Sequence, residues 1–562
     1  QVSGTITNAD GAALAGVTVS LRGTTTVVVS NDRGEFSIPA QSGVLVFSHV
    51  GFQEQEITIS GQSRLSVKML IDQSSLSGVV VVGYGTVKKA DVTTSVATVT
   101  SKQLENRPVM GALEAMAGQM AGVDIQQGNG QPGVPGMKVR IRGTNSISGS
   151  SDPLYVVDGV PMPDALSTVS VNDIENVTVL KDVSATAIYG SRGSSGVILI
   201  TTKKAKSGTP VISVNSSVGM QQIARKIPMM GKEDYLELLI ESKNNSWVDR
   251  DPVVNKATDD NATRQARGAA GSIKYIIPDG SSNPWGTFKY DIQNPADVAK
   301  MPDTDWQDEI YRNALITQNE VLVSGGTDNT RYVISGNYGK QDGIMINSTF
   351  QRFNVRAKVE SKLRKNLTVG LQLMGNTGNG RRQAQGRNEA LGGWGINLAA
   401  LSLAPVFPVT NPDGSYADMQ RNSNILGAGQ PGFNAVELAN NRYHYQKTYG
   451  WSAFGFAEWE IIPDLKYKLT VNGQLGNNEN SFFEPKGVND YGVTTTGTTS
   501  SNVRNNTKTT LIENLLNYNL TVAKKNNIAL LGGYTIENAV FSSINTTANN
   551  APTNYVQLVT GT

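Results

Sequence analysis

The stretch that decides the fold reads LYVVDGVP at 154–161, IENVTVLKD at 174–182, AIYGSRG at 187–193 and GVILITTK at 196–203. The last of these runs predicts a β-strand. Charged residues interrupt this otherwise apolar text and the strand-like run before it: Arg140, Arg142, Lys181, Asp182 and Arg192. The sequence changes character on both sides, with short strands and turns before it and long alternating strands after it.

The composition narrows the class of protein. The chain has 562 residues, a formal net charge of +2 and no cysteine. This length predicts several domains, and the near-neutral charge gives no reason to expect nucleic acid as a partner. The lack of cysteine excludes disulfides, thiolate catalysis and cysteine-ligated metal sites. No apolar run approaches the roughly 18–20 residues of a membrane helix, so this chain can cross a membrane only as a closed β-barrel.

From residue 211 onward, apolar and polar residues alternate as they do in the strands of a transmembrane barrel. In one run Phe353, Val355, Ala357 and Val359 oppose Asn354, Arg356, Lys358 and Glu360. A soluble sandwich alternates too, so each strand alone is weak evidence. The aromatic residues that could form an interfacial girdle are Tyr443, Tyr445, Tyr449, Trp451 and Trp459. About nine strands are predicted, near 211–220, 317–325, 330–340, 351–360, 366–375, 449–461, 464–475, 509–522 and 527–538. We expect long loops without secondary structure at 224–314, 376–448 and 477–507.

Residues 1–72 predict a small β-sandwich, because turn signals separate short alternating strands. Residues 73–90 form a linker that contains a β-branched run: Val79, Val80, Val81, Val82, Gly83, Tyr84 and Gly85. This run flanked by Gly and Ser predicts a strand with no neighbour from its own loops. It is either an ordinary core strand or a strand that adds to a partner's sheet.

Other motifs carry little chemistry. GNGQPG at 128–133 matches a dinucleotide-binding pattern, but its prolines and the strand predicted at 137–141 forbid the helix that this motif requires. The two histidines, His49 and His444, lie in different predicted domains and give almost no material for a catalytic triad or a metal site. The acidic cluster at 303–309 lacks the glycine and distal glutamate of a calcium loop, so we interpret it as a helix or turn. No metal, cofactor or enzymatic activity is predicted.

The quoted motifs, continued to AIYGSRGSSGVILITTKK at 187–204, resemble the plug domain of TonB-dependent outer-membrane transporters of the SusC/RagA branch. GTITNADGAALAGVTVSLRGT at 4–24 and NDRGEFSI at 31–38 resemble the carboxypeptidase regulatory-like domain that precedes the plug in many such proteins. The resemblance implies a mostly β chain with a sandwich at 1–72, an α+β plug at 91–205 and barrel strands at 206–562. A helix is expected within the plug at 110–120.

The resemblance also implies a function. Such proteins import oligosaccharides or peptides across the outer membrane with a SusD-like surface lipoprotein as a lid. The run 79–85 corresponds to the segment that binds TonB of the TonB–ExbB–ExbD complex. The plug signature comprises Arg140, Arg142, Asp158, Gly159, Lys181, Asp182, Tyr189, Gly190, Arg192 and Gly193. For Arg140, Arg142, Lys181, Asp182 and Arg192, ion pairs with the barrel wall are favoured over contact with substrate.

Two alternatives stay open: a siderophore or cobalamin receptor on the same fold, and a soluble β-rich adhesin. A barrel that encloses a plug needs about 22 strands, and an odd-numbered open sheet would leave edges in lipid. We therefore expect the natural polypeptide to continue, or a second chain to supply the other strands. The sequence does not distinguish a glycan from a peptide as substrate.

Overall fold

The structure is a computed structural model. It describes residues 2–8, 13–22, 24, 26–40, 42–49, 52, 55–69, 79–82, 85–88, 96–105, 109–127, 130–133, 137–144, 151–162, 165–205, 207–268, 274–280, 289–383, 395–419, 434–486, 489–490, 493–494, 497–522 and 526–550. The chain divides into two compact units, one of residues 1–98 and 178–199 and one of residues 99–177 and 200–562.

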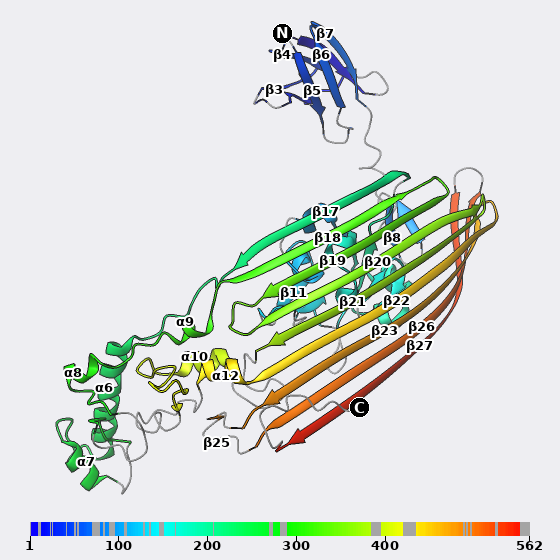
Figure 1. Cartoon of the computed structure of the whole chain (residues 1–562). Coiled ribbons are helices and arrows are strands. Elements are labelled where there is room, and N and C mark those ends of the chain that lie inside the picture. The colour runs from blue at the N-terminus through cyan, green and yellow to red at the C-terminus, as the bar shows by residue number, and fades with distance from the viewer. Residues whose placement is uncertain are drawn as a thin grey trace. The chain divides into compact units, whose positions relative to one another are not determined.

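The N-terminal region is a β-sandwich with its own core. Its two sheets have the strand orders β4-β1-β7 and β3-β2-β5-β6 (Figure 1). The strands are β1 (Val2–Thr7), β2 (Thr18–Leu21), β3 (Val27–Val29), β4 (Glu35–Ile38), β5 (Ser42–Ser48), β6 (Gln55–Ser60) and β7 (Arg64–Lys68). Alternate side chains such as Ile6, Val19 and Leu45 meet in one buried cluster between the sheets. The sandwich expected from the alternation and turns is therefore present.

The β-branched run of the linker forms strand β8 (Val79–Val82), which pairs antiparallel with β9 (Gly85–Lys88). The expectation that this strand has no neighbour of its own was wrong. Val82 pairs with Gly85, so the chain reverses at once and supplies the partner. Gly83 and Tyr84 lie outside the described residues.

The next region mixes short helices and strands. Its elements are β10 (Val96–Thr100), α2 (Ser101–Glu105), α3 (Ala112–Met116), β11 (Val123–Gln127), β12 (Met137–Ile141), β13 (Leu154–Val157), β14 (Val160–Pro161), α4 (Ala165–Thr168), η2 (Val171–Asp173), β15 (Ile174–Leu180), α5 (Val183–Thr186), η3 (Ala187–Gly193) and β16 (Val197–Thr202). Strands β10-β15-β16-β13-β14 form one sheet, and β11 pairs with β12. The helix expected at 110–120 is shorter and ends at Met116. Residues 99–177 and 200–205 are called the plug segment from here on.

A single antiparallel sheet, called the wall, dominates the rest of the chain (Figure 1). Nine strands follow one another in sequence order: β17 (Gly208–Gln221), β18 (Ala314–Gly326), β19 (Thr330–Asp342), β20 (Thr349–Arg364), β21 (Leu367–Arg382), β22 (Tyr443–Ile462), β23 (Leu465–Glu484), β26 (Thr499–Val522) and β27 (Asn526–Asn549). A small hairpin, β24 (Asn489–Asp490) and β25 (Val493–Thr494), lies in one connection. The predicted strands are confirmed, although most are longer than expected.

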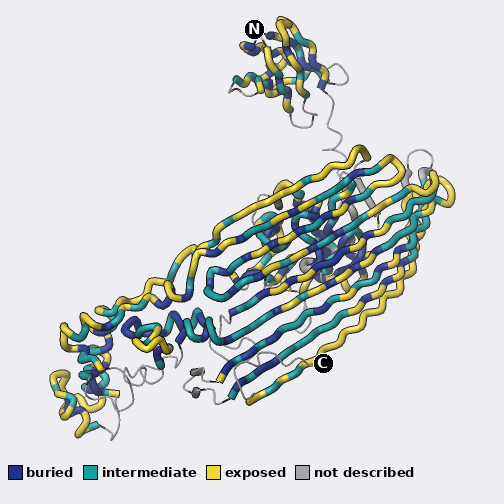
Figure 2. Tube along the Cα trace, viewed as in Figure 1, coloured by how far each residue is buried: buried dark blue, intermediate teal, exposed yellow. Residues whose placement is uncertain are grey.

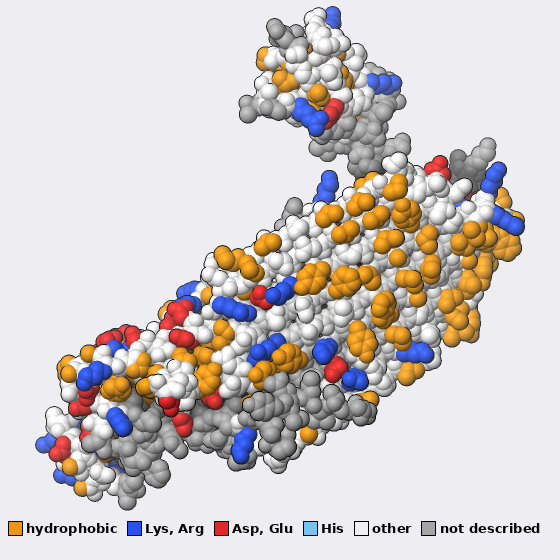
Figure 3. All heavy atoms as spheres, in the orientation of Figure 1, with side chains coloured by type: hydrophobic (Ala, Val, Ile, Leu, Met, Phe, Trp, Pro, Cys, Tyr) orange, Lys and Arg blue, Asp and Glu red, His pale blue; other side chains and the backbone are white. Residues whose placement is uncertain are grey.

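The two faces of the wall differ in character. One face exposes large apolar side chains, which Figure 3 shows gathered over the strands. Examples are Val214, Val218, Ile334, Phe353, Leu371, Leu373, Trp451, Val471 and Ile512. The opposite face carries buried polar residues, so buried and exposed positions alternate along the strands (Figure 2). This inner face meets the plug segment.

The two ends of the wall also differ. At one end, called the short-turn end, tight connections at 327–329, 365–366 and 463–464 join the strands. At the other, called the long-loop end, residues 222–313 and 383–442 link β17 to β18 and β21 to β22. None of the helices in the described part of the chain is long and apolar enough to cross a membrane.

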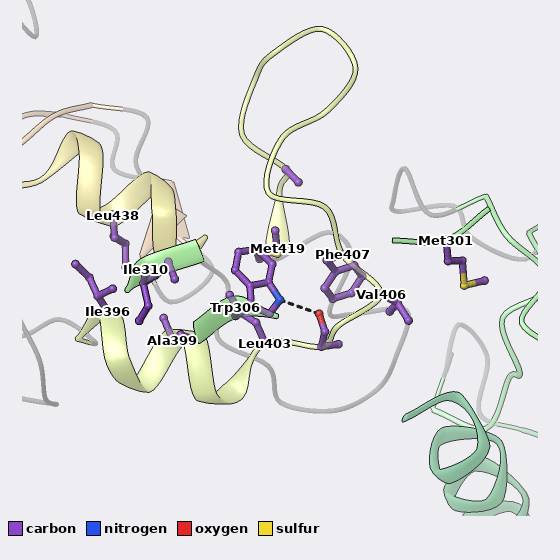
Figure 4. Close-up of a cluster of buried hydrophobic side chains, with 14 of the residues drawn as sticks. Met301, Trp306, Ile310, Ile396, Ala399, Leu403, Val406, Phe407, Met419 and Leu438 are labelled. Atoms are coloured by element: carbon purple, nitrogen blue, oxygen red, sulfur yellow. Dashed lines mark hydrogen bonds between the residues drawn. The ribbon is translucent and has the colours of Figure 1, made fainter. Parts of the chain in front are cut away.

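The long loops were expected to lack secondary structure, and this was wrong, whereas the helix or turn expected at the acidic cluster 303–309 is present as a helix. They contain α6 (Lys232–Arg250), α7 (Asn261–Arg267), α8 (Pro295–Val298), α9 (Trp306–Ile310), α10 (Ile396–Ser402) and α12 (Ala435–Asn441). Residues from both loops share one apolar core, in which Ile310 lies near side chains of α10 (Figure 4). The Trp306 indole donates from Nε1 to the carbonyl oxygen of Ala404 at 3.0 Å. These elements are called the helical cluster.

Candidate functional site

The site begins at a tight hairpin in the plug segment. Strands β13 and β14 are joined by Asp158 and Gly159, whose φ angles are 47° and 91°. An Asp-Gly pair with both φ values positive is the preferred connection for a two-residue hairpin, because it matches the twist of the strands. The turn leaves the Asp158 carboxylate beside Thr202, which donates its backbone N–H at 2.9 Å and its hydroxyl at 2.6 Å.

Two cations of the wall strand β20 face the plug segment. Lys358 Nζ lies 3.2 Å from Asp158 Oδ2, and Arg356 Nη2 lies 3.1 Å from Asp173 Oδ1. The Arg356 and Asp173 side chains are only 2% and 3% exposed, and those of Lys358 and Asp158 are 12% and 7% exposed. Asp158, Asp173, Thr202, Arg356 and Lys358 are called the buried charge cluster.

Further hydrogen bonds surround the two ion pairs. The Asp173 carboxylate accepts from the Ser335 hydroxyl at 2.5 Å and from the Asn337 amide at 3.1 Å, both on β19. Arg356 Nη1 also donates to the Thr202 hydroxyl and to the carbonyl of Lys203, each at 3.2 Å. Removing ions from water costs several kcal/mol for each ion, which attraction offsets only with good geometry and further hydrogen bonds. Among the described residues, Arg356 Nε and Nη2 make no hydrogen bond, so the cluster meets that condition only in part.

The charge state of Asp158 follows from its partners. Burial, the largest influence, would by itself raise the pKa of this carboxyl. The Lys358 ammonium and the hydrogen bonds from Thr202 outweigh it, so the pKa lies below its ordinary value. Asp158 is therefore ionised at neutral pH. Its carboxylate joins the plug segment to the wall through the ion pair with Lys358.

Other polar contacts join the plug segment to the wall. Arg352 Nη2 donates to the Val169 carbonyl at 3.1 Å, and Asn354 donates to the Thr168 carbonyl at 2.9 Å. Farther around the sheet, Gln474 on β23 donates to the carbonyl of Pro161 at 3.0 Å. The wall thus binds plug backbone through neutral and charged side chains.

A cavity of about 420 Å³ lies between the plug segment and the wall. Helix α3 with the preceding Met110, together with Met137 and Met162, borders it on the plug side. On the wall side it is lined by strands β20 to β23, β26 and β27. Arg352 lines it, and this residue lies four positions nearer the long-loop end of β20 than Arg356. At roughly 3.3 Å per residue, four positions correspond to about 13 Å along the strand between the backbones of Arg352 and Arg356.

Only some residues of the predicted plug signature lie at the wall. Asp158 and Gly159 form the hairpin described above. Arg140 pairs with Asp152 of the plug segment itself at 2.5 Å, and Arg142 follows β12 with a φ of 58°. The others lie between β15 and β16: Lys181 and Asp182 follow β15, and Tyr189, Gly190, Arg192 and Gly193 lie in η3. Their role at the wall stays a prediction.

Sequence reasoning missed Asp173 and its partner Arg356 as site residues. The signal was available, because Arg356 and Lys358 were both assigned to the polar face of one strand. Cations buried on the inner face of a barrel need carboxylates opposite them. No group of three or more potential metal ligands occurs among the described residues, and His444 lies near the start of β22.

Family models match two parts of the chain. Residues 88–197 match the TonB-dependent receptor plug domain, and residues 2–82 match the carboxypeptidase regulatory-like domain. The identified resemblance of both regions is therefore confirmed.

Curated relatives extend the match along the chain. TonB-dependent receptor P3 of Formosa agariphila is 35% identical over 543 residues, which are 96% of this chain and 48% of the relative. TonB-dependent receptor SusC of Bacteroides thetaiotaomicron is 30% identical over 505 residues, 84% of this chain and 44% of that protein. The chain spans about half the length of the curated relatives it matches.

Solved structures agree with this assignment. The RagAB peptide importer in its open-open state shares 26% sequence identity, with a TM-score of 0.67 over 86% of this chain and 51% of that chain. The chain thus has the fold of the plug and barrel wall of TonB-dependent receptors, and it is similar to their SusC-like members over most of its length.

Proposed function

We propose that this chain, similar as it is to SusC-like TonB-dependent receptors, acts in the TonB-dependent import of a large nutrient across the outer membrane. The nutrient is an oligosaccharide or a peptide. One observation carries the proposal: the wall exposes apolar side chains on one face and holds a plug segment on the other through buried ion pairs. Contact with lipid requires apolar side chains on the outer face of the wall. Polar contacts on the inner face let the plug segment close the path and still separate from the wall.

The orientation follows from the two ends of the wall. Outer-membrane barrels have short periplasmic turns and longer extracellular loops. The long-loop end with the helical cluster then faces the outside of the cell, and the short-turn end faces the periplasm. Substrate enters from the helical cluster and passes the plug segment.

Energy reaches the plug through the run at 79–85. Strand β8 is rich in valine and short, a suitable segment for addition to another protein's sheet. Because β8 pairs with β9, TonB must add to the free edge of this hairpin or displace β9. Force applied there by the TonB–ExbB–ExbD complex is transmitted along the chain into the plug.

Deletion of 79–85 tests this step. We expect unchanged amounts of protein in the outer membrane and no growth on the transported nutrient. A deletion of six residues at 73–78, within the same linker, serves as the control and should preserve growth. Normal growth of the 79–85 variant would show that coupling occurs elsewhere.

A SusD-like surface lipoprotein is the proposed lid, and the helical cluster is its proposed contact. The segment leading to the cluster exposes three apolar side chains close together in the sequence: Ile227, Met229 and Met230. Exposed apolar groups of this kind mark interaction surfaces when they gather in one region. Gentle detergent extraction should copurify the lipoprotein, and Met229→Glu with Met230→Glu should reduce its yield. Lys300→Glu is the control, and repeated isolation without any lipoprotein would count against the lid.

A further inference from the structure

Basic side chains lie on the apolar outer face of the wall, toward its long-loop end (Figure 3). Lys447 on β22 pairs with Glu479 on β23, and Glu479 pairs with Arg504 on β26. Directly paired residues point to the same face, with Cβ atoms about 4.5–5.5 Å apart. Trp451, which is 59% exposed, lies four positions from Lys447, and this even spacing places both on the outer face. Lys508 lies on that face too, four positions after Arg504. Lys447, Arg504 and Lys508 are called the basic rim.

The depth of the basic rim follows from the aromatic residues of β22. Tyr449 and Trp459 are 50% and 46% exposed on the outer face, and they lie ten positions apart. At roughly 3.3 Å per residue this is about 33 Å along the strand, or about 25 Å of height at a barrel tilt of about 40°. The apolar band of such barrels is about 25 Å tall, with aromatic residues at both borders. Tyr449 therefore marks the long-loop border of the band, and Lys447, two residues beyond it, lies at the level of lipid headgroups.

The charges of the basic rim exceed those of the carboxylates near it. Glu479 accepts from Arg504 Nη2 at 3.3 Å and from the Asn502 amide at 2.8 Å. The Glu479 side chain is 18% exposed and that of Arg504 is 44% exposed, so the guanidinium is the more accessible group of this pair. Lys447 and Lys508 are both exposed. Neither lysine forms an ion pair with any described residue, so both ammonium groups are available to an anion.

Lys508 is unfavourably placed unless an anion reaches it. It pairs with Leu475 on one side and Val540 on the other, which are 55% and 52% exposed. Leu475 in turn pairs with Trp451. A lysine among lipid-facing apolar residues is destabilising, and increasingly so with depth in the bilayer. Its flexible four-carbon stem can cover apolar surface while the ammonium extends toward the headgroups. A lipid with an anionic headgroup would therefore match both the charge of Lys508 and its apolar neighbours.

We propose that the basic rim binds a phosphorylated lipid of the outward-facing leaflet, with the lipid phosphate among Lys447, Arg504 and Lys508. The acyl chains lie on apolar side chains of the same face, such as Trp451 and Leu475. A lipid fits better than a soluble anion, because these cations border an open apolar surface and not a closed pocket. The inference goes beyond the proposed import and rests on it only for the placement of the wall in the outer membrane.

The test uses the full natural protein in detergent. Bound lipid is measured by native mass spectrometry during titration with dioleoylphosphatidic acid, with dioleoylphosphatidylcholine as the zwitterionic lipid of equal acyl chains. A third titration uses inorganic phosphate. Lys447→Gln with Lys508→Gln removes two exposed charges and breaks no ion pair among the described residues. The dissociation constant of this variant for phosphatidic acid should rise by about tenfold or more, because each basic residue near an anionic headgroup adds to binding.

Two other double variants are the controls. Lys447→Arg with Lys508→Arg keeps both charges and should retain phosphatidic acid. Lys340→Gln with Lys466→Gln also removes two charges from the wall, but each of these lysines already lies 3.6 Å from a carboxylate. This second control should bind phosphatidic acid as the unchanged protein does.

Each outcome decides. Tighter binding of phosphatidic acid than of phosphatidylcholine, lost only in the glutamine variant of the rim, supports the proposal. Equal binding of the two lipids, or binding of neither, overturns it, and so does an equal loss in either control. Inorganic phosphate that binds as tightly as phosphatidic acid assigns the rim to a free anion and overturns the lipid. Growth of the 79–85 deletion tests import separately, so the two proposals fail independently.

Discussion

Replacing Asp173 by asparagine should loosen the plug segment from the wall. The substitution keeps the size of the side chain and an acceptor for Ser335 or Asn337, but it removes the charge opposite Arg356. The Arg356 guanidinium is 2% exposed and 3.1 Å from Asp173, so water does not replace the lost carboxylate. The substitution therefore measures the contribution of the ion pair, with little change in the packing around it.

Breaking a buried pair by removing one partner costs about 3–5 kcal/mol, because a buried charge is left uncompensated. Arg356 keeps its hydrogen bonds to Thr202 and Lys203, which places the expected cost near the lower limit, about 3 kcal/mol. At 1.4 kcal/mol for each factor of ten, local opening of the plug segment should increase by roughly 100-fold.

Native-state hydrogen exchange measured by mass spectrometry gives this opening free energy. Peptides covering 154–173 report on the plug segment, and peptides from the wall serve as an internal reference. Asp173→Asn together with Arg356→Met should recover most of the protection, because replacing both partners of a buried pair is close to neutral. An increase in exchange below about tenfold, or a double variant no better than the single one, would refute the reasoning.

Three further predictions concern other parts of the chain. Burial, with a smaller effect of Asp418, raises the pKa of Glu437 from 4.5 to about 7; the folded helical cluster then favours the protonated form, so its stability falls as pH rises from about 4.5 through 7. Glu437→Gln should remove this dependence and slow proteolysis of the cluster at about pH 8 but not at about pH 4; equal effects at both values would contradict it. Trp306→Ala should cost the cluster about 3–5 kcal/mol and expose residues 222–313 to limited proteolysis while the wall stays protected. The isolated fragment 1–72 should fold by itself, because its core is internal, and a poorly dispersed NMR spectrum would show otherwise.

The alternation of apolar and polar residues predicted the wall, because the apolar positions of each strand lie on its exposed face and the polar positions lie on the face toward the plug segment. The alternation underestimated the length of a strand where both of its faces are polar. Strand β26 was predicted from 509 but begins at Thr499, since TSSNVRNNTK at 499–508 is polar on both faces. Pairing with β23 continues through this segment, and backbone pairing leaves no trace in a local pattern.

The helical cluster and the buried charge cluster were missed for a related reason. Helix α9 was expected as a helix or turn, but α10 and α12 have only seven residues each, too few to show a period. The core that the three helices share joins residues from two distant loops. Asp173 likewise acquires its role only through Arg356, 183 positions later, a contact that no local motif encodes. The resemblance of its motifs identified the plug, but the contacts that hold the plug segment to the wall could be identified only from the folded structure.

The chemistry of the plug–wall contact fits the proposed import, in which the plug segment separates from the wall and returns. An apolar seal of the same strength would expose its surface when opened, at about 25 cal/mol for each Å², and water entering the gap would not reduce that cost. Buried ion pairs behave differently, because each charge regains its hydration as soon as water reaches it. Asp158 and Asp173 with Lys358 and Arg356 therefore hold the plug while the site is dry and separate more easily once it is wetted. We expect the wall to present these two cations, with Ser335 and Asn337, to the path that opens during the proposed import.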